Sequence, residues 1–248
     1  MTVSRRIAAL SAVFIGCAVP AATPATAVVG GTEVQAANYP WLAAVGSPLF
    51  LTRASGQFCG GALIAPDQVL TAAHCVSLAG LVPQALTVTF DRSDLSVKDG
   101  TKVGVTAVRL HPDFREETVD GVDVYHNDVA VLTLAQAQSR PTVQIAAAHG
   151  GSATILGWGG TSDGDTSNTR LHTATVPLVS DDDCARAYPA AFNATEMVCA
   201  GSTTADTGEY DSGGPLLVDG KLAGLTSWGR GVAQPGYPGV YTRLPVSF

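Results

Sequence analysis

The sequence has few charged and few aromatic residues: of its 248 residues, 14% are charged and 6% are aromatic. A hydrophobic fraction of 46%, with 27 glycines and 14 prolines, excludes a disordered chain and indicates a compact, turn-rich globular protein. Basic residues are also scarce, since 14 Lys and Arg stand against 21 Asp and Glu and give a net charge of -7. No basic stripe interrupts this acidic background, so nucleic acid and anionic lipid are disfavoured as partners and cationic ligands fit better.

Long hydrophobic runs are absent beyond the N-terminal segment, so we expect no membrane-spanning helix in the mature protein. Two arginines precede the apolar run 7–19, and the small residues after it reach an A-x-A signal-peptidase site at 25–27. This pattern predicts a signal peptide over residues 1–27 and a secreted, extracellular product. A membrane anchor is the alternative, but the run is short and prolines interrupt the residues after it.

Cysteine is scarce as well. One of the five cysteines lies within the signal, and the mature chain keeps an even number: Cys59, Cys75, Cys184 and Cys199. In an oxidising compartment this indicates two disulfides, and the sequence allows three pairings. Zinc is disfavoured because no Cys-x-x-Cys or paired histidine spacing accompanies them. Asp91, Asp94 and Asp99 lack the spacing of a calcium loop and are interpreted as solvated turn acids, so we expect neither metal nor cofactor.

Helical patterns are almost missing, and short apolar or alternating runs recur between clusters of Gly, Pro, Asp and Ser. The only plausible helical turns follow Ala72 and Ser180. About a dozen strands without crossover helices predict an all-β protein, either antiparallel barrels or a sandwich. The predicted strands are 41–45, 61–64, 68–72, 86–90, 103–110, 128–134, 153–156, 173–179, 215–218, 221–227 and 239–244.

Three strings carry candidate chemistry. The string 211–215 puts Ser212 in a glycine-rich turn before an apolar run, as needed to hold a nucleophile on an exposed, rigid bend. His74 follows the apolar strand 68–72, and Asp128 opens another strand. Each string alone has another interpretation: a hairpin turn, a structural histidine at a strand end, or a turn-forming aspartate.

Together, in the order His, Asp, Ser, the three strings resemble the trypsin-like family of serine proteases, in particular its secreted bacterial members. The resemblance covers nearly the whole mature chain, because 28–31 (VVGG) resembles the family's new N-terminus and the strings at 227–229 and 239–241 resemble its pocket walls. It implies one trypsin-like domain over 28–248. That domain would be two six-stranded antiparallel β-barrels, about 28–140 and 141–248, with the active site in the cleft between them.

The resemblance also implies a role for each residue. Ser212 would attack the peptide bond and form an acyl-enzyme, His74 would act as general base and acid, and Asp128 would hold the histidine ring. Ser227 would hydrogen-bond that aspartate, and the backbone of Ser227, Trp228 and Gly229 would pair with substrate as an added strand. The implied disulfides are Cys59–Cys75, which would help to fix the strand carrying the base, and Cys184–Cys199.

Counting back from Ser212, the resemblance assigns Asp206 to the floor of the specificity pocket. A carboxylate there suits arginine or lysine, and Gly229 and Gly239 on the walls leave room for a long side chain. A surface-loop aspartate is the other interpretation. The implied partners are polypeptide substrates with Arg or Lys and proteinaceous protease inhibitors, and we expect a monomer.

Two departures from the family pattern concern the pocket and the oxyanion hole. Gly208 and Val232 stand where the family has a disulfide, so the pocket loop lacks that covalent tie. Tyr210 stands where the family nearly always has glycine, whose N–H joins that of Ser212 in the oxyanion hole. A side chain here is expected to disturb the peptide, and because loss of one such donor costs about 10² to 10³ in turnover, we expect a slow enzyme.

The resemblance also implies how the enzyme is activated, through the new N-terminus at Val28. In the family a freed α-amino group pairs with the aspartate before the nucleophile, and the corresponding residues are Val28 and Asp211. Cleavage after Ala27 would create Val28 directly, so secretion and activation are expected to be one event. Cleavage near residue 21 or 22 would instead leave a short propeptide that another protease must remove.

Two functions therefore remain open from the sequence. The first is a secreted serine endopeptidase that cleaves after Arg or Lys. The second is a catalytically impaired homologue that acts as a secreted binding protein, and three features motivate it: Tyr210, the missing bridge, and a chain that stops at Phe248 where the family continues into a final helix.

Overall fold

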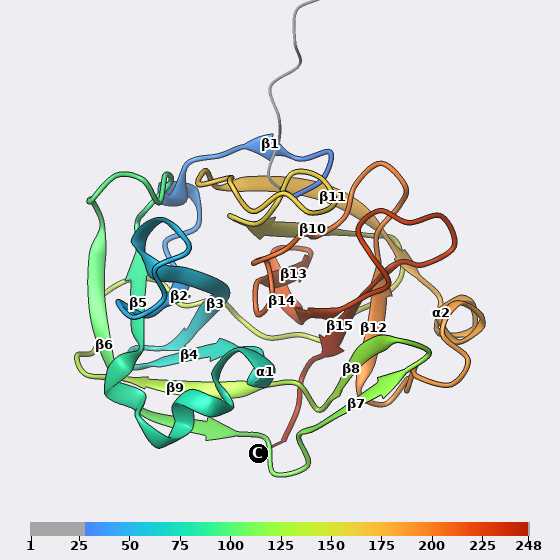
Figure 1. The fold of residues 1–248 in the computed structure, drawn as a ribbon, viewed down its shortest axis with the longest axis horizontal. Coiled ribbons are helices and arrows are strands. Elements are labelled where there is room, and N and C mark those ends of the chain that lie inside the picture. Colours follow the sequence, from blue (N-terminus) through green and yellow to red (C-terminus); the bar gives the residue numbers. More distant parts are fainter. Residues whose placement is uncertain (1–27, 248) are drawn as a thin grey trace, which may run out of the picture.

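The computed structural model describes residues 28–247, which form mostly strands and a few short helices (Figure 1). The signal peptide expected over 1–27 lies outside the described residues. Within residues 28–247, no helix combines the length and apolar character that crossing a membrane requires. The all-β class predicted from the alternating runs is confirmed.

The first barrel is closed by six antiparallel strands in the order β2-β3-β4-β9-β6-β5. Its interior is apolar because alternate residues of these strands face inward, as with Val103 and Val105 of β6, which are buried between exposed neighbours. The strands are β2 (Leu42–Gly46), β3 (Gln57–Ala65), β4 (Gln68–Thr71), β5 (Thr87–Phe90), β6 (Thr101–Leu110) and β9 (Ala130–Leu134).

The second barrel contains six strands in the order β11-β10-β13-β14-β15-β12, and a pairing of β11 with β12 closes it. The short strand β1 (Thr32–Glu33) adds to the outside of β11. The prediction of two six-stranded antiparallel barrels is thus confirmed. The strands are β10 (Ser152–Gly157), β11 (His172–Val179), β12 (Met197–Ala200), β13 (Pro215–Val218), β14 (Lys221–Trp228) and β15 (Gly239–Arg243).

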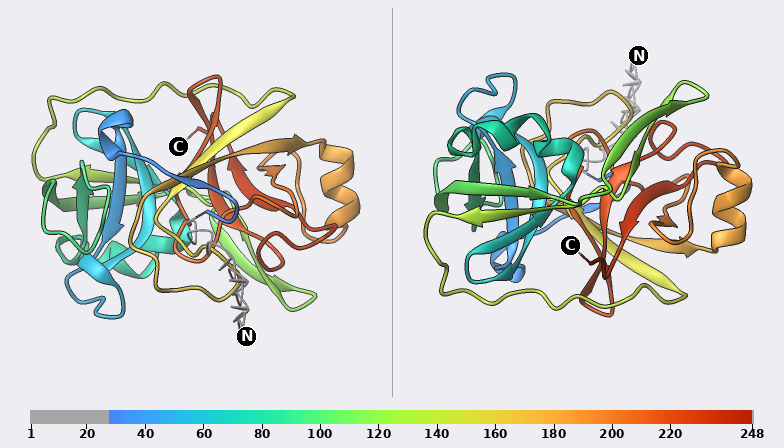
Figure 2. Two further views of the ribbon diagram at one scale, coloured as in Figure 1. Left: turned by 90° about the horizontal axis from the view of Figure 1, so that it is seen from above. Right: turned by 90° about the horizontal axis from the view of Figure 1, so that it is seen from below.

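The apolar core of the first barrel extends across the interface between the barrels, while the second barrel also has a cluster of its own. The cluster that fills the first barrel continues into the second through Leu156, Trp158 and Leu225, all nearly inaccessible to solvent. A single extended segment, residues 135–151, connects the barrels along one side of the molecule (Figure 2). Loops from both barrels are therefore held in fixed positions relative to one another.

The helices are short. The two α-helices, α1 (Ala73–Val76) and α2 (Asp181–Ala187), follow the two residues at which helical turns were predicted. Ser180 caps α2, since its hydroxyl accepts a hydrogen bond from the backbone N–H of Asp183. In the part of the chain that the structure describes, four 3₁₀ turns complete the set: η1 (Ala36–Asn38), η2 (Ala54–Gly56), η3 (Leu78–Leu81) and η4 (Pro83–Ala85).

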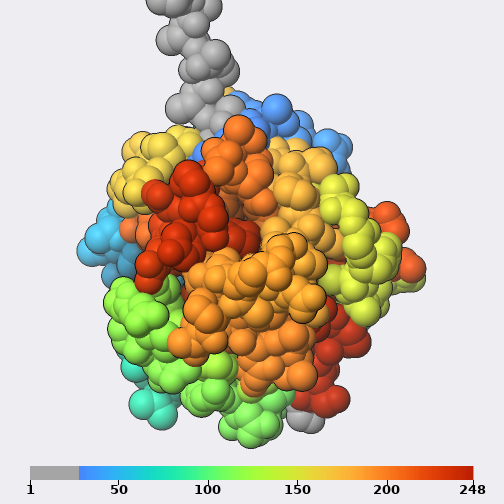
Figure 3. All heavy atoms as spheres, turned by 90° about the vertical axis from the view of Figure 1, so that its right-hand side faces the viewer, coloured from blue at the N-terminus to red at the C-terminus, as the bar shows by residue number. Residues whose placement is uncertain are grey.

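A separate hairpin, β7 (Arg115–Val119) with β8 (Val122–His126), was not predicted from the sequence. It leaves the first barrel and packs on the second, where Val124 lies in one buried cluster with Tyr188 and Trp228. Figure 3 shows this green hairpin beside the orange segment around α2 and the red loop near residue 230. The hairpin thereby borders the cavity that lies between the barrels.

Both implied disulfides are present. Cys59 on β3 is bonded to Cys75 on α1, and Cys184 on α2 is bonded to Cys199 on β12, with Cα–Cα distances of 6.4 and 6.0 Å. Each bridge joins a helix to a barrel strand. The first bridge fixes α1, the helix that carries His74.

Candidate active site

A cavity of about 540 Å³ is lined by residues of both barrels and of the β7–β8 hairpin. Closure of the two barrels brings together residues that are far apart in the sequence, including most of the predicted site. The predicted residues that line it are His74, Asp206, Tyr210, Ser212, Ser227, Trp228, Gly229 and Gly239.

The first feature of the site is a buried carboxylate with three hydrogen-bond donors. Asp128 is 1% exposed, and its Oδ2 lies 2.8 Å from His74 Nδ1 and accepts a 2.6 Å hydrogen bond from Ser227 Oγ. Its Oδ1 accepts from the backbone N–H of His74 at 2.8 Å. Because an ionised carboxylate only accepts, Nδ1 of His74 is the donor of this hydrogen bond, and in the neutral imidazole the lone pair is then on Nε2.

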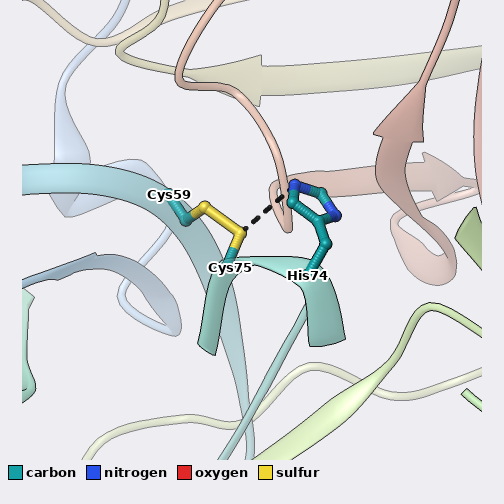
Figure 4. A group of neighbouring side chains, drawn as sticks. All are labelled: Cys59, His74 and Cys75. Carbon is teal, nitrogen blue, oxygen red and sulfur yellow. Dashed lines mark hydrogen bonds between the residues drawn. A yellow bond between two sulfur atoms is a disulfide. The ribbon is translucent and has the colours of Figure 1, made fainter. Parts of the chain in front are cut away.

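The His74 ring is held on two further sides. Tyr125 of β8 stacks on it, with ring centroids 4.4 Å apart and planes inclined by 14°. Nε2 lies 3.7 Å from Cys75 Sγ (Figure 4). Because Sγ of Cys75 is bonded to Cys59, the sulfurs beside His74 are not thiolates. Within residues 28–247, Nε2 makes no hydrogen bond to Ser212, a contact that often tightens only when substrate binds.

Glycines allow the Ser212 turn of the second barrel to dock on β3 of the first. Gly213 has φ +73°, and a Cβ on it would lie 2.4 Å from Thr71 Oγ1. A Cβ on Gly60 would lie 2.8 Å from the Cα of Gly214. The carbonyl of Ser212 accepts a 2.7 Å hydrogen bond from Gly60 N, so the serine turn is fixed at the barrel interface.

Two backbone N–H groups at this turn have no acceptor. Those of Tyr210 and Ser212 donate to no group within residues 28–247, although both residues line the cavity. The carbonyl of Glu209 accepts from Gly160 N at 2.9 Å. Because the peptide bond between Glu209 and Tyr210 is trans, the N–H of Tyr210 points away from Gly160. Tyr210 itself has φ 71°, a left-handed conformation that glycine adopts at lower cost.

Asp206 lines the cavity and is 2% exposed. Its carboxylate accepts hydrogen bonds from the backbone N–H groups of Thr207 at 2.8 Å and Ala233 at 3.0 Å. Burial raises the pKa of Asp206 to about 6, although both hydrogen bonds lower it. A Cβ on Gly239 would lie 2.7 Å from Asp206 Oδ1, so any other residue at 239 would fill the space beside this carboxylate.

The predicted activation pair, Val28 and Asp211, is buried and does not line the cavity. Asp211 is 1% exposed, accepts hydrogen bonds from the N–H groups of Gly159 at 2.7 Å and Gly208 at 2.9 Å, and burial raises its pKa to about 7. Val28 is fully buried in the core of the second barrel with Ala205. In the uncleaved sequence Ala27 precedes Val28, so Val28 has a peptide nitrogen rather than a free amino group and pairing with Asp211 would require cleavage.

Sequence reasoning missed three residues that the structure places at or beside the site: Arg53, Gln57 and Tyr125. Tyr125 lies in the unpredicted hairpin. Arg53 stands in a turn-rich loop, where a buried arginine has the same local pattern as an exposed one. No sequence signal marks any of the three residues, because their contacts with the site come from distant segments.

Comparison with known proteins agrees with this geometry. The family model described as Trypsin matches residues 28–247. A trypsin of Saccharopolyspora erythraea is 40% identical over 225 residues, which cover 88% of this chain and 93% of that protein. Trypsin Tyr p 3.0101 of Tyrophagus putrescentiae is 35% identical over 232 residues, 88% of this chain and 76% of that protein. A trypsin-like protease of Streptomyces glaucescens is 35% identical over 260 residues, 98% of this chain and 90% of that protein.

Proposed function

Since the chain belongs to the trypsin family of serine proteases, we propose that it is a secreted endopeptidase that cleaves peptide bonds after Arg or Lys through an acyl-enzyme. One observation carries the proposal. A histidine whose Nδ1 is bound to a buried carboxylate borders the same cavity as a serine on a fixed turn and a second buried carboxylate, that of Asp206.

The proposed chemistry uses the free lone pair of His74. Nε2 takes the proton of Ser212 Oγ as the oxygen attacks the carbonyl carbon, and His74 then gives that proton to the leaving amine. The acyl-enzyme ester is hydrolysed by water, which His74 deprotonates in turn. Asp128 stabilises the imidazolium that forms in each half of the reaction, and Ser227 holds Asp128 in place.

The two N–H groups without acceptors are the proposed oxyanion hole. Those of Tyr210 and Ser212 would donate to the oxygen that becomes negative in the tetrahedral intermediate. Positive φ is costly for a bulky residue, so the loop conformation of Tyr210 competes with less strained ones. Turnover is therefore expected to be slow relative to a glycine at this position.

The proposed preference for Arg and Lys rests on Asp206. Its two backbone donors leave acceptor capacity on both oxygens, so a guanidinium or ammonium group can bind there. A cation bound to Asp206 would also offset the burial that raises the pKa of this group. The corresponding partners are polypeptides with accessible Arg or Lys, and proteinaceous inhibitors that present such a residue to the cavity.

The proposed activation pairs the freed amino group of Val28 with Asp211. A buried carboxylate without a counter-charge is unfavourable, which is the reason that burial raises the pKa of Asp211. A buried ammonium group would compensate it and thereby order the loop from Gly208 to Ser212. Cleavage after Ala27, and hence the N-terminal start at Val28, belongs to the same proposal.

A fluorophosphonate probe tests the proposed function. The purified secreted protein is expected to bind the probe covalently, and neither Ser212→Ala nor His74→Ala is expected to react. An Arg p-nitroanilide substrate should be hydrolysed with the same dependence on both residues. Absence of labelling, or residual activity that His74→Ala does not change, would favour the binding-protein alternative, which Tyr210 and the missing bridge at Gly208 motivate.

A further inference from the structure

Arg53 is a buried cation without a carboxylate within salt-bridge distance among residues 28–247. Its side chain donates hydrogen bonds only to neutral acceptors. Burying a charge is unfavourable unless hydrogen bonds and neighbouring charges compensate it, so the burial of the Arg53 cation must be explained by its other contacts. Nε donates to Gln57 Oε1 at 3.1 Å, Nη1 to the carbonyl of Thr166 at 2.9 Å, and Nη2 to the carbonyls of Trp158 at 2.9 Å and Asn168 at 3.0 Å.

One face of the Arg53 guanidinium covers the ring of Tyr210. Its central carbon lies 4.2 Å from the ring centroid, within the range of a cation–π contact. Phe50 contacts the same ring edge-on, at a centroid distance of 6.3 Å. Gln57, which accepts from Arg53, donates from Nε2 to the carbonyl of Tyr210 at 3.0 Å. Arg53 therefore contacts Tyr210 directly through the ring and indirectly through Gln57.

These contacts explain how a tyrosine keeps a backbone conformation suited to glycine. A bulky residue with φ 71° persists only where its surroundings fix it from several sides. Arg53 and Phe50 fix the ring, Gln57 fixes the carbonyl, and the Glu209 carbonyl on Gly160 fixes the preceding peptide. Of the three side chains, those of Arg53, Phe50 and Gln57, only that of Arg53 is also hydrogen-bonded to the loop 158–168 in the described part of the chain, and this loop contains Gly160.

We propose that Arg53 is a positioning residue for the oxyanion hole: it holds the Tyr210 ring and the adjoining loop so that the Tyr210 N–H stays available to the substrate oxygen. The proposal rests on the proposed protease function and deepens it. Arg53 and Tyr210 form a functional pair, in which the arginine maintains the loop shape that glycine would allow by itself.

The test is a double-mutant cycle between Arg53→Met and Tyr210→Gly. Methionine removes the cation and its donors but keeps an unbranched chain. In the wild-type background, which has Tyr210, Arg53→Met is expected to lower kcat for an Arg p-nitroanilide about tenfold with KM nearly unchanged, as for partial loss of one oxyanion donor. In the Tyr210→Gly background the same substitution is expected to change kcat less than about twofold.

Two inhibitors distinguish an effect of the substitution on the oxyanion hole from an effect on the specificity pocket. A peptidyl arginal forms a hemiacetal whose oxygen needs the oxyanion donors, whereas benzamidine needs only the pocket. Arg53→Met is expected to weaken the arginal by a factor similar to the loss in kcat and to leave the benzamidine inhibition constant unchanged. Arg53→Lys, which keeps the charge but not the planar fork, should recover part of both losses.

Arg140→Met is the matched control. Arg140 also stacks on a ring, that of Phe90 at 4.4 Å, but neither residue lines the cavity, so its replacement should leave kcat and both inhibition constants unchanged. If Arg53→Met does not fold, as judged by circular dichroism, Arg53→Lys takes its place in the cycle.

Three outcomes would overturn the inference. Equal losses in the wild-type and Tyr210→Gly backgrounds would show that Arg53 does not act through Tyr210. Parallel weakening of arginal and benzamidine would show a general disturbance of the pocket. A wild-type protein that neither hydrolyses the substrate nor binds either inhibitor would overturn the proposed function and the inference with it. Because the wild type is assayed first, this outcome is distinguished from a failure of the inference alone.

Discussion

Ser227 Oγ donates a 2.6 Å hydrogen bond to Asp128 Oδ2, and this bond joins β14 of the second barrel to the segment that precedes β9 of the first. Thr242 of β15 donates from Oγ1 to the backbone carbonyl of Asp128 at 2.7 Å. Two residues of the second barrel thus hold the aspartate that orients His74. The position of the proposed base therefore depends on both barrels.

Ser227→Ala is expected to lower kcat about tenfold, because a hydrogen bond to a charged acceptor contributes about 1.5 kcal/mol or more. In this variant Asp128 keeps its hydrogen bonds to His74 but no longer accepts one from residue 227. Steady-state kinetics on an Arg p-nitroanilide measure the effect. Thr242→Val is the control, since it touches only the backbone carbonyl of Asp128 and should lower the melting temperature more than kcat. An unchanged kcat in Ser227→Ala would contradict the positioning role.

Asp206→Ser is expected to lower the kcat/KM ratio of Arg over Phe substrates by about 100-fold or more, because the charged partner of the substrate cation is lost. In the wild type, kcat/KM for Arg substrates should rise with pH through about 6, as Asp206 loses its proton. Asp163→Ser is the matched control, since Asp163 lines the same cavity but is exposed. A wild-type cleavage profile dominated by aromatic or small residues would refute the assignment of Asp206.

Tyr210→Gly is expected to raise kcat for an Arg ester or amide about tenfold or more, because glycine adopts φ 71° without the strain that tyrosine carries. Turnover is measured per active site after titration with a fluorophosphonate. Glu209→Gly adds flexibility at the neighbouring residue without relieving Tyr210, so it should not raise kcat. A folded Tyr210→Gly protein with unchanged or lower turnover would show that Tyr210 does not limit the rate.

The free amino group of Val28 is expected to be required for activity. N-terminal sequencing of the secreted protein should find Val28 first, and the same protein expressed with Met before Val28 should be nearly inactive. A secreted protein that starts at Thr23, is not trimmed later and is fully active would contradict this prediction.

The same pair predicts a pH dependence of stability. In the uncleaved chain burial raises the pKa of Asp211 to about 7, so the folded state binds its proton more tightly than the unfolded state. The free energy of unfolding should then fall as pH rises from about 4 to about 7. Asp211→Asn should remove this part of the pH dependence, measured by urea unfolding in the Ser212→Ala background. Protein that starts at Val28 should lose less stability over this range, because its amino group compensates the carboxylate.

Much of the fold was predictable because barrel strands have one face in a core and one outside it. From this alternation, the ends of β6 and β11 were predicted to within two residues of their observed positions. It failed for β7, whose residues are charged and mostly exposed, and for β12, which is four residues long and buried throughout. Neither strand has the alternation on which the prediction depends.

The residue types and order of the proposed site could be predicted without a structure, because His74, Asp128 and Ser212 each stand in a recognisable local string. The even set of cysteines was equally evident, although it was compatible with three pairings. The groups around these residues became known only in the folded chain. The stacking of Tyr125 on His74, the burial of Arg53 over Tyr210 and the left-handed backbone of Tyr210 are not marked by any local pattern. These contacts join segments far apart in the chain, so they exist only after both barrels close and their loops meet at the cavity.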